Sequence, residues 1–261
     1  MKGPRTGRAL DLVAPVALVA LLLAGWEVAC RVLQVPAYLL PSPSGVAAAF
    51  GANSGLLLIS AWNTLGMALS ALILAAAIAI PLALATALSP LLERAVSPLA
   101  VTLQVTPVVA IAPLVVIWAG LDHPERAITT LAAVVAFFPL FSGALTGLKS
   151  ADPDLERLFD LYGARPLQRL VRLRIPAAVP FLIEGVKVAA GLSVIGAVVA
   201  EFVAGSGGAQ GLAWRILEAG NRLRTAEMFA ALFALAVLGA GLYGLLQAAE
   251  RRIIRLWRGR D

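Results

Sequence analysis

Residues 127–148 read AITTLAAVVAFFPLFSGALTGL and contain no Asp, Glu, Lys or Arg. An uncharged apolar run of roughly eighteen residues or more is long enough to cross a bilayer as a helix. Three further uncharged runs lie on either side of it, at 32–92, 95–121 and 228–249. The whole chain of 261 residues is 60% hydrophobic and 14% charged, with a mean hydropathy of +0.89. These values predict an all-α integral membrane protein and exclude a cytosolic enzyme, a disordered protein and a secreted disulfide module.

The uncharged runs and the helix-breaking residues together predict six transmembrane helices. Their ranges are Leu12–Leu33, Ile59–Leu88, Leu99–Leu121, Ala127–Leu148, Pro180–Val203 and Met228–Ala249. The first run could pass for a signal peptide, but it is longer than a typical signal core and lacks a small-x-small cleavage site. We therefore expect a retained first helix, which places both termini on one side of the membrane. Prolines that interrupt these helices predict either kinks beside a pathway or packing around a bend; they are Pro81, Pro107, Pro113 and Pro139.

The distribution of basic residues predicts the orientation of these helices. If the termini are cytoplasmic, the inner segments hold fifteen Lys and Arg residues and the outer segments hold five. Since cytoplasmic loops carry an excess of Lys and Arg, both termini are predicted to be cytoplasmic in a multi-pass protein of the bacterial inner (plasma) membrane. The basic residues are spread over four inner segments, which is typical of anchoring to anionic membrane lipid. The pI of 10.2 therefore does not predict a nucleic-acid partner.

The residues that could support chemistry are few and badly placed for it. One cysteine, Cys30, cannot form an intrachain disulfide, and together with the single His123 it cannot make a zinc site. We expect no metal and no cofactor, and we expect His123 to be a solvated loop residue. The aspartates lie at or beyond the ends of the predicted helices, which argues against an intramembrane protease. No G-x-x-x-x-G-K-[ST] motif occurs, and the glycines at 205–208 lack a lysine, so an ion gradient or a partner ATPase must supply the energy.

The segment 149–179, between the fourth and fifth predicted helices, is longer than a plain connector needs to be. Asp152 suits an N-cap, Pro153 a first helical position, and Gly163 the left-handed residue after a helix end. A helix of about ten residues is predicted between them, with an apolar face made by Leu155, Leu158, Phe159 and Tyr162. The charged residues Asp154, Glu156, Arg157 and Asp160 are predicted to point away from that face. A second amphipathic helix is predicted from Pro166 to Arg174, closed by Pro176, and helices this short need something to pack against.

The sequence of this loop resembles the signature of binding-protein-dependent ABC importer permeases. Residues 156–176 read ERLFDLYGARPLQRLVRLRIP. The signature is Glu-Ala-Ala, three residues, Gly, nine residues and Ile-x-Leu-Pro; Gly163 and the closing Leu-Arg-Ile-Pro at 173–176 keep this spacing. Arg-Leu-Phe at 157–159 replaces Glu-Ala-Ala, so the family's charge contact is not carried over. Three further motifs resemble the nitrate, sulfonate, taurine and thiamine-precursor pyrimidine subgroup: Leu-Pro-Ser-Pro at 40–43, Thr-Pro-Val-Val-Ala-Ile-Ala-Pro-Leu at 106–114 and Ala-Glu-Phe at 200–202.

The resemblance implies a type I ABC importer permease fold and an assembly built around it. It implies a homodimer of this chain, two cytoplasmic ATPase subunits, and a solute-binding protein that delivers the ligand. The loop would carry a coupling helix that docks on an ATPase, although an apolar helix face could also lie on the membrane surface. The implied coupling residues are Leu155, Leu158, Phe159, Tyr162, Gly163 and Pro176. The expected divisions are 1–58 (tail, first helix and Pro-rich periplasmic loop), 59–249 (permease domain with coupling loop 149–179) and 250–261 (basic tail).

Three charged residues within the fifth predicted helix are candidates for the translocation path. Glu184 and Lys187 lie three residues apart on one face, where they either line the path or reach toward the membrane surface. Glu201 lies near the outer end, either at the mouth or as an ordinary interfacial carboxylate. An ion-coupled secondary transporter is the alternative, but it would normally show inverted repeats and charges in several helices. The substrate stays open between a small anion (sulfonate, taurine or nitrate) and a neutral pyrimidine, because the binding protein does most of the selecting.

Overall fold

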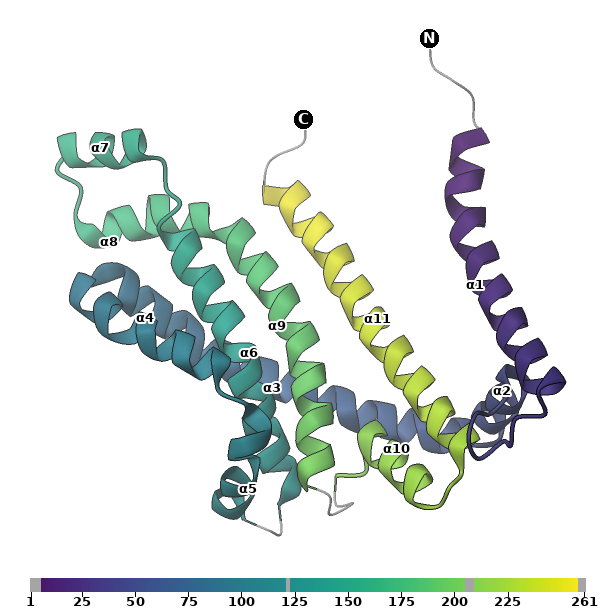
Figure 1. Cartoon of the computed structure of the whole chain (residues 1–261). Coiled ribbons are helices and arrows are strands. Elements are labelled where there is room, and N and C mark those ends of the chain that lie inside the picture. Colours follow the sequence, from purple (N-terminus) through teal and green to yellow (C-terminus); the bar gives the residue numbers. More distant parts are fainter. Residues whose placement is uncertain (1–5, 121–122, 205–208, 258–261) are drawn as a thin grey trace. The chain divides into compact units, whose positions relative to one another are not determined.

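The computed structural model describes residues 6–120, 123–204 and 209–257, and every regular element in this part of the chain is helical (Figure 1). The first elements are α1 (Thr6–Val32), α2 (Pro43–Ala52), α3 (Ser54–Leu88), α4 (Pro90–Val105), α5 (Val108–Ala119) and α6 (Pro124–Leu148). The remaining elements are α7 (Pro153–Leu161), α8 (Pro166–Arg169), the π-helix η1 (Leu170–Arg174), α9 (Ile175–Ala204), α10 (Leu212–Asn221) and α11 (Thr225–Trp257).

Four helical stretches among the described residues are long and apolar enough to cross a membrane. They are α3, α6, the continuous run Pro166–Ala204, and Thr225–Arg255 within α11. A fifth is formed if α4 and α5 count as one span, although they meet at an angle of 99°. The helical, membrane-spanning fold predicted from the uncharged runs is therefore confirmed. The sixth span, predicted over α1, is not among these stretches, so the count of six stays a prediction.

The chain forms two compact units. The first unit comprises Met1–Leu58 and Arg215–Ala234, which include α1 and α2. The second comprises Ile59–Trp214 and Leu235–Asp261, which include α4 to α9. The division expected from sequence, with boundaries at residues 59 and 250, stays a prediction.

Helices α6 and α9 lie side by side and form the centre of the second unit (Figure 1). Glycine and alanine line their contact, so the two backbones approach closely. A methyl group added at Gly147 would lie 2.9 Å from the Cα atom of Ala178, and one added at Gly196 would lie 2.8 Å from the Cα atom of Ala132. These distances are too short for a side chain, so the α6–α9 pair depends on glycine at these positions.

The third predicted span, Leu99–Leu121, is divided between α4 and α5 rather than being one helix. Thr106, at the C-terminal end of α4, has φ −69° and ψ 124°, which is an extended conformation. This is the conformation expected before a proline, because the Pro107 ring disfavours a helical residue in front of it and supplies no N–H. Leu121 lies outside the described residues. The other three prolines singled out from the sequence, Pro81, Pro113 and Pro139, lie inside helices.

The prediction that Pro176 closes a short helix is wrong. Residues 166–204 run as one continuous helical stretch, in which Pro176 is the second residue of α9. The turn just before it is π-helical, and the N–H of Ile175 donates to the carbonyl of Leu170. A π-turn moves the hydrogen bonds from i→i−4 to i→i−5, which accommodates a residue without an N–H and lets the helix continue.

Candidate functional site

The loop helix α7 begins and ends at the residues predicted from sequence. Asp152 is its N-cap, and its Oδ1 accepts a 2.8 Å hydrogen bond from the N–H of Asp154, with Pro153 at the first helical position. Gly163, just past the end, has φ +61°, where glycine meets no steric penalty. The N–H groups of Gly163 and Ala164 donate to the carbonyls of Asp160 and Phe159, both at 3.0 Å. Both ends of α7 are therefore satisfied by its own residues.

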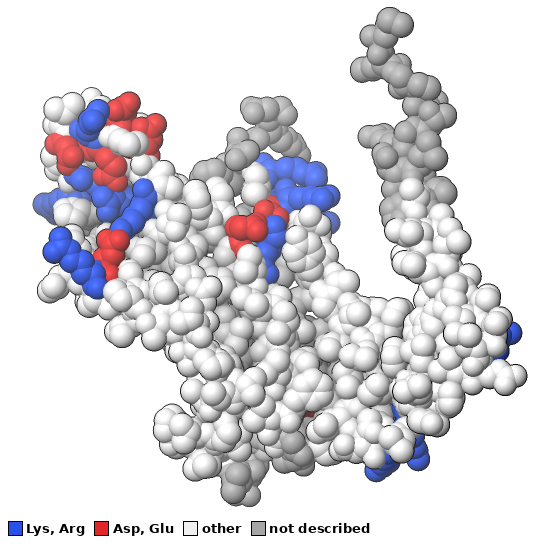
Figure 2. All heavy atoms as spheres, viewed as in Figure 1, with Lys and Arg blue, Asp and Glu red and all other residues white. Residues whose placement is uncertain are grey.

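A cluster of ion pairs fixes α7 to the helical segment that follows it. Arg174 Nε lies 2.7 Å from Glu156 Oε1, and Arg169 Nε lies 3.4 Å from Glu156 Oε2. Arg169 also pairs with Asp160. Figure 2 shows these charges gathered over α7 and α8. Glu156 and Asp160 were predicted only to point away from the apolar face; the structure adds that arginines from α8 and η1 turn back onto α7 and pair with them.

The apolar face of α7 is left uncovered by the chain itself. Leu155, Leu158 and Tyr162 are exposed, whereas Phe159 is only partly so. Leu161, which the sequence interpretation did not single out, is 85% exposed. Its spacing of three residues from Leu158 is the signal that could have identified it. We call Leu155, Leu158, Leu161 and Tyr162 the α7 apolar surface.

The base of the loop is anchored to the membrane helices of the second unit. Leu170 and Leu173 of η1 are buried, and Leu170 packs in a small core with Leu148 of α6 and Ala178 of α9. Ser150 Oγ donates to the carbonyl of Gly147 at 2.8 Å. Because η1 is packed against α6 and α9, a displacement of α7 would move these helices and not only bend the loop between them.

The structure pairs two of the three candidate path residues, Glu184 and Lys187, and places Glu201 apart from them. Lys187 Nζ lies 2.9 Å from Glu184 Oε2 and 2.8 Å from Glu250 Oε2, and it sits 5.9 Å from the ring centroid of Tyr243. Lys187 thus ties α9 to α11. The Glu184 side chain is 61% exposed and lines an open cavity of about 410 Å³, which Lys187 does not line.

Glu201, the third candidate, is buried and binds backbone. Its Oε1 accepts from the N–H of Gly211 at 2.5 Å, and its Oε2 accepts from the N–H of Ala213 at 3.2 Å. Thr64 Oγ1 of α3 accepts from the N–H of Leu212 at 2.9 Å. Two side chains from different helices therefore cap the start of α10. No sequence pattern pointed to Thr64. Residues 205–208 lie outside the described residues.

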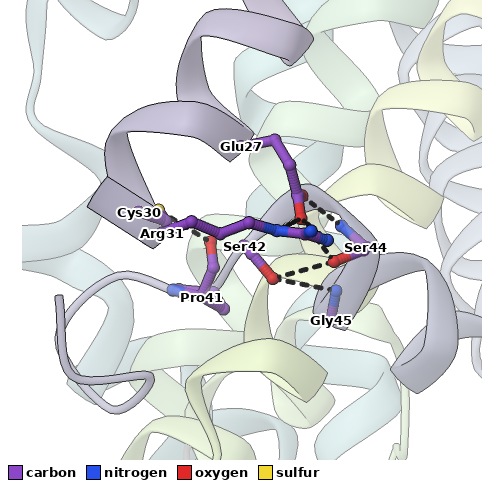
Figure 3. Close-up of polar contacts among 7 residues, drawn as sticks. All are labelled: Glu27, Cys30, Arg31, Pro41, Ser42, Ser44 and Gly45. Carbon is purple, nitrogen blue, oxygen red and sulfur yellow. Dashed lines mark hydrogen bonds and ion pairs between the residues drawn. The ribbon is translucent and has the colours of Figure 1, made fainter. Parts of the chain in front are cut away.

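A group of hydrogen bonds that was not predicted from the sequence joins α1 to α2 in the first unit (Figure 3). The carboxylate of Glu27 accepts from the backbone N–H of Ser44 at 3.0 Å and from its hydroxyl at 2.8 Å. Arg31 Nε donates to the same carboxylate at 2.7 Å. Ser42 Oγ accepts from the N–H of Gly45 at 3.2 Å as the N-cap of α2. The Leu-Pro-Ser-Pro motif thus forms the turn that starts α2.

Among the described residues, no three His, Cys, Asp or Glu side chains lie together in a way that could hold a metal ion. His123 is half-exposed, and its Nδ1 lies 3.3 Å from Glu125 Oε1. Its position agrees with the loop residue expected from sequence.

Comparison with known proteins identifies the protein family of this chain. Residues 77–255 match the sequence model of the family described as "Binding-protein-dependent transport system inner membrane component". The chain belongs to this family of ABC importer permeases. The resemblance seen in the loop motif is thereby confirmed over most of the chain.

Curated relatives extend the match to almost the full length. The chain is 31% identical over 252 residues to the formylaminopyrimidine transport permease protein of Halalkalibacterium halodurans, covering 96% of this chain and 98% of that protein. It is 35% identical over 243 residues to the riboflavin transport system permease protein of Chloroflexus aurantiacus, covering 92% and 88%. It is 28% identical over 249 residues to the taurine transport system permease protein of Escherichia coli, covering 93% and 88%.

A solved structure of the MetNI methionine ABC transporter, in an inward-facing conformation, has a chain with the same fold. It aligns with a TM-score of 0.65 at 20% identity and covers 78% of this chain and 97% of that chain. This agreement confirms the type I ABC importer permease fold expected from sequence.

Proposed function

We propose that this permease works as a homodimer with two cytoplasmic ATPase subunits and a solute-binding protein, and imports a small solute across the inner membrane. In this assembly the ATPase hydrolyses ATP, and α7 is the coupling helix that docks on it. The observation that carries the proposal is the α7 apolar surface. It is exposed, yet the helix that bears it is capped at both ends and held by Glu156 to Arg169 and Arg174.

The alternative for α7 is a helix lying on the membrane surface. Charge does not decide between the two, because Glu156 and Asp160 are paired with arginines of α8 and η1. The family supports the protein groove, since permeases of this family work with a partner ATPase.

For the solute path, we propose the open cavity beside Glu184, in keeping with the candidate role given to this residue by the sequence. Its lining also includes the polar side chains of Gln104, Ser142 and Thr146. Among the described lining residues none is Lys or Arg, and Glu184 supplies a carboxylate. Because Lys187 lies 2.9 Å from this carboxylate and balances its charge, the lining does not choose between a small anion and a neutral pyrimidine, and both stay candidates. The ion-coupled transporter alternative has no support from the comparisons.

Lys187 and Glu201 are weaker candidates than Glu184 for lining the solute path. Lys187 is paired with Glu184 and Glu250 between two helices of the second unit. Glu201 is buried and holds the start of α10. For both residues we propose that they shape the path through the helices they fix, rather than by touching the solute.

Copurification with the ATPase tests the proposed coupling role. The ATPase is first identified by mass spectrometry as the subunit that copurifies with the tagged chain from its own membranes. Leu158→Asp with Leu161→Asp should then release it while the permease still inserts. Burial of the exposed parts of both side chains is worth ~2–4 kcal/mol, which corresponds to a loss of about thirtyfold to a thousandfold in affinity.

Asp154→Ser is the matched control on the same helix. Its ion pair with Arg157 is exposed, so the ATPase should stay bound at close to wild-type stoichiometry. If the double variant retains its ATPase and supports uptake, α7 is not the coupling element.

A further inference from the structure

The open cavity beside Glu184 presents hydroxyl groups that the chain itself leaves unpaired. Ser142 and Thr146 lie four residues apart on one face of α6, and both line the cavity. Within the described residues, neither hydroxyl makes a hydrogen bond. Hydroxyls in membrane helices commonly bond to a carbonyl of their own helix. Five others in this unit do so; they belong to Thr86, Thr102, Thr106, Thr130 and Ser193. The two hydroxyls of the cavity are therefore available to a solute.

The carboxylate of Glu184 adds a hydrogen-bond acceptor to the same cavity. Lys187 Nζ bonds to its Oε2 at 2.9 Å, whereas its Oε1 has no partner among the described residues. Lys187 does not line the cavity, so it holds the carboxylate without filling the space in front of it. An ionised carboxylate accepts hydrogen bonds and donates none. Its remaining oxygen is therefore suited to a donor on the solute.

The close approach of α6 and α9 brings these groups together. A methyl group added at Gly143 would lie 3.2 Å from the Cα atom of Gly185. Ser142 and Glu184 are the residues just before these two glycines, and both line the cavity. Their side chains therefore leave the two backbones at neighbouring points.

The number of acceptors indicates which solute group fits best. Glu184 Oε1 and the two hydroxyl oxygens are three acceptors on one cavity wall. A solute hydroxyl offers one hydrogen, whereas an amino group offers two and an ammonium group three. An amino group can therefore bond to several of these oxygens at once. Phe138 and Phe181 line the same cavity and would contact the apolar part of the solute.

We propose that Glu184, Ser142 and Thr146 bind an amino group of the transported solute. This group is either the ammonium of an amino-substituted anion or an amino group on a neutral ring. The inference rests on the proposed function, because it assigns a chemical preference to the proposed solute path. Both charge classes stay open, but nitrate and sulfonates without an N–H are poor ligands for this wall.

Protection of a cysteine in the cavity from alkylation tests the proposal. Val188→Cys, in a Cys30→Ala background, places a thiol one turn from Glu184 in the same cavity. The tagged chain, purified with its ATPase, is treated with a small water-soluble thiol reagent, and alkylation of residue 188 is followed by mass spectrometry. The probes are two pairs of compounds that differ only in an amino group: taurine with ethanesulfonate, and 4-aminopyrimidine with pyrimidine.

The amino member of at least one pair should slow alkylation at a concentration at least tenfold lower than its partner, since a hydrogen bond to a charged group is worth about that factor. A difference in the taurine pair identifies an amino-substituted anion, and one in the pyrimidine pair a ring amine. Glu184→Ala should remove the difference, and Ser142→Ala should reduce it about threefold. Glu93→Ala is the matched control and should leave it unchanged, because Glu93 pairs with Lys149 and does not line the cavity.

The proposal is overturned if both members of each pair protect equally, or if the difference survives Glu184→Ala. The comparison within each pair needs no variant at Glu184, so it holds even if Glu184→Ala does not fold. Ile195→Cys, exposed on the same helix but outside the cavity, should not be protected; equal protection there also overturns the site. If the ATPase copurifies while both members protect equally, the amino-group site alone is wrong. If no ATPase copurifies, the proposed assembly is wrong, and protection is still scored on the chain alone.

Discussion

Replacement of Glu201 by alanine tests how α9 holds the start of α10. The carboxylate is 3% exposed and accepts from the N–H groups of Gly211 and Ala213. Both of these residues are buried, so no water takes over readily when the carboxylate is removed. Glu201→Ala should therefore leave two backbone donors unpaired and weaken the first turn of α10.

The size of the effect follows from these two hydrogen bonds. A hydrogen bond to a charged group contributes ~1.5–3 kcal/mol, and two bonds to one carboxylate do not add fully. We therefore expect a loss of about 3–4 kcal/mol in the free energy of local opening, or about 10²- to 10³-fold in the opening equilibrium. Glu201→Gln keeps one oxygen acceptor and should fall about midway. Thr64→Val removes one neutral bond, to the N–H of Leu212, and should change the equilibrium by about fivefold.

Hydrogen–deuterium exchange of the peptide that covers 209–214 measures this opening directly. The variants are compared in the same detergent, at two pH values, so that exchange is known to report the opening equilibrium. Glu184→Ala serves as the control on the same helix, because its side chain is mostly exposed. The reasoning is refuted if Glu201→Ala accelerates exchange less than tenfold, or no more than Thr64→Val does.

Three other predictions concern the loop, the α6–α9 contact and the orientation. Glu156→Ala frees Arg169 and Arg174, so amide exchange in α7 should accelerate about tenfold, whereas Asp154→Ala, which breaks a fully exposed pair, should change it less than threefold. Gly147→Ala forces a methyl group against Ala178 and should destabilise the chain by ~1–3 kcal/mol, seen as a lower melting temperature, whereas Gly191→Ala has open space and should not. In a Cys30→Ala background, an impermeant thiol reagent added outside should label Leu223→Cys and not Leu167→Cys, both exposed sites; the reverse pattern would overturn the predicted orientation.

Local chemistry made much of the loop predictable from sequence. An N-cap, a proline at the first position and a glycine past the end act within a few residues, so Asp152, Pro153 and Gly163 marked both ends of α7 correctly. Uncharged runs located the long helices for the same reason, because the bilayer acts on each run independently. An interruption at Pro107 was predicted, but the division of Leu99–Leu121 into two separate helices was not.

The contacts that could not be predicted from sequence join residues that lie far apart along the chain. Glu156 meets Arg174 eighteen residues later, and Lys187 meets Glu250 from another helix. Glu201 and Thr64 converge on three consecutive amides only once α3, α9 and the start of α10 are packed. The prediction that Pro176 ends a helix failed because a π-turn, which has no recognised sequence signal, precedes it.

The continuous helix through Pro176 bears on how the loop would transmit force. A break at that position would let α8 and η1 pivot freely, so a push on α7 would bend the loop instead of moving the membrane helices. Instead, α7 is fixed to η1 through Glu156 and Arg174, and η1 runs straight into α9. Because α9 is packed against α6 with glycine at Gly147 and Gly196, it cannot slide without carrying α6 along. In the proposed importer, a displacement of α7 by the ATPase would therefore move α6 and α9 as one body, and the open cavity that both helices line would be carried with them past Gln104 of α4.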